Sequence, residues 1–209
     1  MNAMYRVGPL VVAATLLVLA VITLFVGVDR ALLHEGGAFE VASAALWLFT
    51  AAYAALGQVP DRRLAGWLAG LFIVFFLREL DFHDWWFDPG LLHVKVLTGA
   101  APLWQKAVSL GAMIGILAVV FAVGWLGAGR FVRALRARDT AAWLVLVAMG
   151  CAAISSQLDG LGRTLEPYSI QINAAVQDTA IFFEETLEIA FPMLIILALS
   201  LALKRKRVG

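Results

Sequence analysis

A cluster of ionisable side chains follows the third apolar stretch of the chain. Arg78, Glu79, Asp81 and His83 come directly after an apolar run of 14 residues, 64–77. At about 1.5 Å per residue, a helix over this run covers about 21 Å of a hydrocarbon core that is about 30 Å thick. If the helix spans a membrane, its first charges lie at membrane depth. A charge there costs about 2.5–3.5 kcal/mol on insertion scales, and such residues usually mark a functional site.

A second cluster opens the last apolar stretch. Glu184, Glu185 and Glu188 precede a largely apolar run of 15 residues. Glu184 and Glu188 are four residues apart, so they share one face of a helix. Glu79 and His83 have the same spacing, provided that the third helix continues that far. Two carboxylates on one helix and a carboxylate–imidazole pair on another are typical ligands of a divalent metal.

Polar groups at the ends of two further stretches complete the expected site. Two arginines oppose seven carboxylates in it, so a metal or added protons would balance the remaining charge. We expect a divalent metal, zinc or iron, with the ligands Glu40, Glu79, His83, Glu184 and Glu188. We expect the catalytic groups, acting as base, as supports of the ligands or as holders of an anionic group, to be Asp81, Asp159, Glu185, Arg78 and Arg163.

Each of these groups also has a simpler structural interpretation. Glu184 and Glu185 could interact with the dipole at the start of a helix. Arg78 could pair with an acid of its own stretch, and Asp159 with Arg163, four residues later. The other two histidines of the chain lie in predicted loops, where solvated side chains are usual. The functional interpretation is favoured because the polar groups fall at the same end of four predicted helices.

Composition and hydropathy indicate an all-α polytopic membrane protein. The 209 residues are 62% hydrophobic, with a mean hydropathy of +0.88. The net charge of +1 gives no sign of nucleic-acid binding, and a single cysteine, Cys151, excludes an internal disulfide and a cysteine-based zinc site. We expect one domain, 1–209, built as a bundle of six transmembrane helices. Their expected ranges are about 8–28, 40–57, 64–82, 107–127, 141–160 and 181–203.

The distribution of basic residues predicts the orientation of the bundle. If six helices alternate, eleven of the 16 lysines and arginines fall on one side, whereas only Asp61 and Asp139 of the 15 acids do. The positive-inside rule then places both termini in the cytoplasm. Trp85 and Trp86, just after the first cluster, fit the aromatic belt of the outer interface. We expect a bacterial inner membrane, with the site facing the periplasm.

The sequence predicts a metal-dependent membrane enzyme that acts on a lipid or a lipophilic substrate, by hydrolysis or by oxidation at an iron pair. Two alternatives stay open. The acids could form the pathway of a cation- or proton-coupled transporter, although the inner halves of the predicted helices are almost free of polar residues. The chain could also be an accessory or assembly subunit, whose charged end binds a membrane protein partner.

Overall fold

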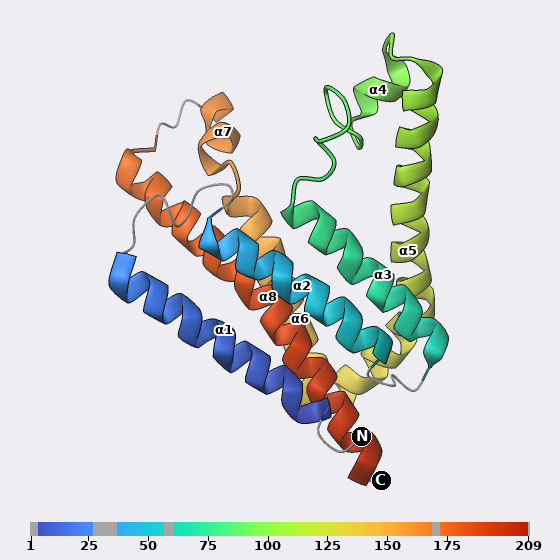
Figure 1. Cartoon of the computed structure of the whole chain (residues 1–209), viewed down its shortest axis with the longest axis vertical. Helices are drawn as coiled ribbons and strands as arrows, with labels where there is room; N and C mark the ends of the chain where they lie inside the picture. Colours follow the sequence, from blue (N-terminus) through green and yellow to red (C-terminus); the bar gives the residue numbers. More distant parts are fainter. Residues whose placement is uncertain (1–3, 27–36, 57–60, 169–171, 209) are drawn as a thin grey trace. The chain divides into compact units, whose positions relative to one another are not determined.

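The computed structural model describes residues 4–26, 37–56, 61–168 and 172–208 (Figure 1). The described residues form helices, turns and short connections, without strands, so the predicted all-α class is confirmed. In chain order the helices are α1 (Met4–Val26), α2 (Ala38–Leu56), α3 (Arg62–Glu79), α4 (Val94–Thr98), α5 (Leu103–Arg136), α6 (Thr140–Leu158), α7 (Leu161–Leu165), the 3-10 helix η2 (Glu166–Tyr168) and α8 (Ala174–Val208).

Five of the described helices, α1, α2, α5, α6 and α8, are long and apolar enough to cross a membrane. They indicate an integral membrane protein. The remaining predicted span, 64–82, corresponds to α3, which has 18 residues and carries four charges at its two ends. Those charges lower its mean hydropathy, so a count of six spans stays a prediction.

Several helix boundaries differ from the predicted ones, and three of these differences matter most. α5 runs for 34 residues to Arg136, so most of the basic segment expected to connect two helices is itself helical. At about 1.5 Å per residue this helix is about 51 Å long, more than a hydrocarbon core needs. α8 begins at Ala174, seven residues before its predicted start. α3 ends at Glu79, three residues before its predicted end.

Large apolar side chains are exposed along several of the long helices. Leu24 and Phe25 of α1 are 82% and 87% exposed, and Phe121 and Trp125 of α5 are 69% and 78% exposed. Contiguous apolar surface of this kind is unfavourable in water and favourable against lipid tails. The exposed apolar faces of these helices therefore support the membrane location that the hydrophobic composition predicts.

The chain divides into two compact units, and each is described by itself. Unit 1 comprises Met1–Leu46 and Ala137–Gly209, and unit 2 comprises Trp47–Arg136. The expected single domain stays a prediction.

In unit 1, α8 packs along both α6 and α1. Gly8 allows α1 to approach α8 closely, because a Cβ atom there would overlap Ser200 Oγ and lie 3.0 Å from Ile196 Cγ2. The first turns of α1 thus lie beside the last turns of α8, and the two ends of the chain are marked in Figure 1. A small residue at such a contact is typical of helix packing in membranes.

In unit 2, α3 and α4 pack against α5. The ring of Trp47 lies 5.7 Å from that of Phe72 and 4.6 Å from that of Phe75, so the second half of α2 contacts α3 through aromatic side chains. Asp61 caps α3 by accepting the N–H groups of the next turn, and Arg130 Nη2 of α5 lies 2.9 Å from Asp61 Oδ2. This ion pair joins the start of α3 to the basic end of α5.

Candidate functional site

The first predicted cluster lies where α3 ends. The N–H of Phe82 donates to Leu77 O at 3.1 Å, and the N–H of Asp81 donates to Arg78 O at 3.0 Å. This pair of bonds is the Schellman motif, in which the residue after the C-cap adopts the left-handed conformation. Asp81 takes that position with a φ of 46°. Since the motif closes the helix after Glu79, the prediction that it continues to residue 82 is wrong.

Glu79 is therefore the last helical residue of α3, and its side chain is buried. Only 4% of the side chain is exposed, and its Oε1 lies 3.6 Å from Arg78 Nη1. The Arg78 side chain is 54% exposed, so the cation of this pair reaches the surface whereas the acid is buried. A buried carboxylate is costly without a cation or hydrogen-bond donors. The expected ion pair between Arg78 and an acid of its own stretch is thus present.

His83 lies in the turn after α3. Its Nε2 is 3.6 Å from Asp84 Oδ1, and its backbone carbonyl accepts the N–H of Leu91. Because α3 ends at Glu79, the helical spacing that would place Glu79 and His83 on one face does not apply. Metal ligation by these two residues stays a prediction without that geometric support.

Aromatic side chains surround the turn after α3. The ring of Phe82 lies 5.3 Å from that of Trp85 and 5.5 Å from that of Trp86. Trp85 and Trp86 are 66% and 56% exposed. Exposed tryptophans next to an apolar helix suit the interface between water and lipid.

The second predicted cluster lies on α8 in unit 1, where α8 packs along α6. Ser155 Oγ of α6 donates a hydrogen bond to Glu188 Oε1 at 3.1 Å. Ser155 is only 2% exposed, and Glu188 is half-buried. The sequence places Ser155 among the polar groups at the end of this stretch, four residues before Asp159, but spacing alone gave it no role. The bond places Glu188 on the side of α8 that faces α6.

Glu184 lies one turn before Glu188 in the same helix and lines a cavity of about 260 Å³. The end of α6, the start of α7 and the first turns of α8 enclose this cavity, which Gln177 also lines. Gly160 makes the turn between α6 and α7 with a φ of 63°, a conformation that suits glycine. Glu184 and Glu188 both belong to the continuous helix α8. Their spacing of four residues therefore places them on one helix face, as the sequence predicts.

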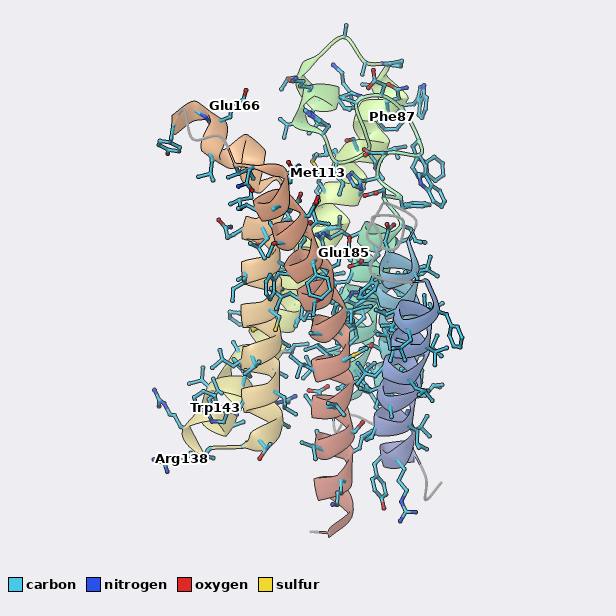
Figure 2. The ribbon with its side chains drawn as sticks, turned by 90° about the vertical axis from the view of Figure 1, so that its left-hand side faces the viewer. Phe87, Met113, Arg138, Trp143, Glu166 and Glu185 are labelled. Carbon is cyan, nitrogen blue, oxygen red and sulfur yellow. The ribbon has the colours of Figure 1, made fainter. Side chains whose placement is uncertain are left out.

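The early start of α8 decides against one simpler interpretation. The first turn of α8 contains no acidic residue. Glu184 and Glu185 are its eleventh and twelfth residues, well beyond the range of the interaction between an acid and the helix N-terminus. Glu185 is half-buried and is labelled on α8 in Figure 2. A dipole interaction at the first turn is thus not the reason for these two acids.

The remaining predicted residues lie at helix ends. Glu40 is in the first turn of α2 and is half-buried. Asp159 is the C-cap of α6, with an exposed side chain, and its N–H donates to Ser155 O at 2.9 Å. Arg163 belongs to α7, and its side chain lies outside the described part of the structure. Asp159 and Arg163 are not in one helix, because α6 ends at Leu158.

The two other histidines have different outcomes. His93 is the N-cap of α4, and its Nδ1 accepts the N–H of Lys95 at 3.3 Å. It thus has a local structural role. His34 lies outside the described residues.

The structure brings together parts of the predicted set within each unit. Unit 1 places Glu188 against Ser155 and Glu184 beside a cavity, and unit 2 pairs Arg78 with Glu79. Among the residues that the structure describes, no three histidine, cysteine, aspartate or glutamate side chains form a metal-binding group. A single site that joins all ten predicted residues stays a prediction.

Comparison of the chain with models of protein families, with curated proteins and with solved structures finds no match. The functional argument therefore rests on the residues themselves.

Proposed function

We propose that the protein spans a bacterial inner membrane six times, with both termini in the cytoplasm. The charge bias of the sequence supports this orientation. The contact of Gly8 with Ser200 also supports it, since chain ends that lie side by side suit an even number of spans. In this arrangement α3 also crosses the membrane, between α2 and α5 in chain order. Its charged ends lie near the two interfaces, where arginine side chains can reach the headgroups.

We further propose that carboxylates at the periplasmic ends of the helices bind a divalent metal, zinc or iron. The observation that carries this proposal is the pair of acids on α8. Glu188 accepts a hydrogen bond from buried Ser155, and Glu184 lines the cavity one turn away. Two half-buried carboxylates on one face repel each other, and a shared cation would reduce that repulsion. The hydrogen bond from Ser155 would fix the orientation of one ligand.

The proposed reaction is the metal-dependent hydrolysis of a lipid or lipophilic substrate, with oxidation at an iron pair as the other reaction of this donor set. A bound divalent ion would supply a nucleophile at neutral pH and polarise an ester carbonyl. The apolar faces of the helices would admit the substrate from the membrane. Arg78, which is half-exposed beside Glu79, is suited to hold an anionic group of that substrate.

Metal analysis of the purified protein tests this proposal. Wild type loaded with zinc or iron(II) and then desalted should retain about one or two ions per chain. The variants Glu184→Gln and Glu188→Gln should lose most of that metal, because an amide is a poorer ligand of these ions than a carboxylate. Glu166→Gln is the matched control, since Glu166 is an exposed acid outside the cavity. Wild type without stoichiometric metal, or equal metal in all four proteins, would refute the proposal.

Two further results would favour a function other than metal-dependent catalysis. Flux of protons or cations into proteoliposomes that Glu79→Gln abolishes would favour a transporter. A metal-free protein that purifies with another membrane subunit would favour an assembly role.

A further inference from the structure

A groove in unit 1 lies at the opposite end of the helices from the acids of α8. It has a volume of about 530 Å³ and is lined by residues of α1, α6 and α8. Two of the lining residues are cations, Arg6 from the start of α1 and Lys204 from the end of α8. The others are apolar except for Tyr5 and Ser200, and none of the described residues lining the groove is acidic.

We propose that this groove binds one anionic phospholipid. Its phosphate would lie between Arg6 and Lys204, and the upper part of an acyl chain would lie along the leucines below. The charges are complementary, because both ionised groups at the rim are cations and the headgroup carries a phosphate. The apolar lining excludes a free inorganic anion as the preferred ligand, since such an anion gains nothing from the leucine side chains.

The rim of the groove is preorganised for a phosphate. Arg6 Nε donates to Tyr5 Oη at 3.1 Å, and the guanidinium carbon lies 5.6 Å from the centre of the Tyr5 ring. This contact limits the rotamers of the arginine, so less conformational entropy is lost when its remaining N–H groups bind. Lys204 is exposed and adds a second positive charge on the other helix.

The close contact between α1 and α8 gives the groove its shape. Ser200 lines the groove, and its hydroxyl donates to Ile196 O at 2.7 Å within α8. It therefore uses its own proton inside the helix and presents no free donor to the groove. Leu144 supplies the wall from α6. In the proposed orientation, this end of unit 1 lies at the cytoplasmic leaflet, whose anionic lipids attract juxtamembrane cations.

Native mass spectrometry of the detergent-purified protein tests the proposal. Dioleoylphosphatidylglycerol is the probe, dioleoylphosphatidylcholine the zwitterionic comparison, and inorganic phosphate the headgroup alone. We expect wild type to retain one phosphatidylglycerol, little phosphatidylcholine and no phosphate. Arg6→Gln/Lys204→Gln should bind phosphatidylglycerol about 25-fold more weakly, about five-fold for each cation.

Two variants separate the groove from general surface charge. Arg62→Gln/Arg63→Gln removes two exposed cations outside the groove and should bind phosphatidylglycerol as wild type does. Leu144→Trp keeps both cations but fills the apolar wall, and should weaken lipid binding while far-UV circular dichroism stays unchanged. The proposal is overturned if the two double variants lose binding equally, if Leu144→Trp binds normally, or if wild type retains both lipids equally.

Discussion

Replacing Gly8 with alanine should weaken the packing of α1 against α8. The added methyl group would overlap Ser200 Oγ and lie 3.0 Å from Ile196 Cγ2. Ser200 cannot yield without cost, because its hydroxyl is buried and bonded to Ile196 O. Either the hydroxyl leaves that bond or the two helices separate.

The expected magnitude follows from three opposing terms. Alanine is favoured over glycine in a helix by about 0.5–1 kcal/mol. Overpacking costs about 1–3 kcal/mol, and a lost hydrogen bond about 0.5–1.5 kcal/mol. Gly8→Ala should therefore lower the free energy of unfolding by about 1–3 kcal/mol. Ser200→Ala removes the overlapping atom, so the double variant should be more stable than the sum of the single effects by about 0.5–2 kcal/mol.

Equilibrium unfolding in mixed dodecylmaltoside–SDS micelles, followed by far-UV circular dichroism, measures this double-mutant cycle. Gly111→Ala is the control, because a Cβ atom at Gly111 has no neighbour within 4 Å among the described residues. It should leave stability unchanged or raise it by about 0.5–1 kcal/mol. If Gly8→Ala behaves like Gly111→Ala, or if the two effects at Gly8 and Ser200 simply add, the close contact of α1 and α8 is refuted.

Two further predictions concern the ends of α3. The hydrogen bond from Arg130, followed by that from the Leu64 N–H, lowers the pKa of Asp61 below its ordinary value of 3.8. Its contribution to stability is therefore complete above pH 3.8 and is lost as the pH falls through the lowered pKa. The difference in unfolding midpoint between wild type and Asp61→Asn, which keeps a good N-cap, should be constant near neutral pH and disappear in acid. At the other end, Asp81→Gly should stabilise the protein by up to about 1 kcal/mol, and Asp81→Val should destabilise it by about 1–2 kcal/mol, since a Cβ atom is unfavourable at a positive φ. Equal unfolding midpoints of these two variants would contradict a left-handed conformation at Asp81.

The apolar runs predict where the long helices lie, but not where each one ends. α8 starts at Ala174 because Asn173 caps it, with Asn173 Oδ1 accepting the N–H of Val176 at 2.9 Å. Asparagine is among the best N-caps, but an asparagine within a polar connection does not by itself mark the start of a helix. α3 ends in a Schellman motif with aspartate in place of the usual glycine, so the sequence lacks the ordinary stop signal.

The candidate site was harder to predict than the helices. Sequence spacing places Glu184 and Glu188 on one face of a helix, and α8 is continuous there. Spacing does not identify the neighbour of that face, because the rotation of α8 against α6 depends on packing along both helices. The partner Ser155 could therefore be found only in the structure. The expected pairing of Glu79 with His83 depended on four more helical residues, which the turn at Asp81 does not allow.

Because the Glu79–His83 pair loses its helical spacing, the two acids of α8 are the strongest remaining candidates for metal ligands. Before the start of this helix was known, Glu184 could be explained by a favourable interaction with the helix N-terminus. With the helix beginning at Ala174, Glu184 lies ten residues after the first residue of α8 and is too distant for that interaction. Ser155 donates a hydrogen bond to one oxygen of Glu188 and so fixes the orientation of that carboxylate. In the proposed function, a cation bound by Glu184 and Glu188 would reduce the repulsion between two carboxylates on one helix face. For this reason the metal content of Glu184→Gln and Glu188→Gln is the most decisive measurement on this protein.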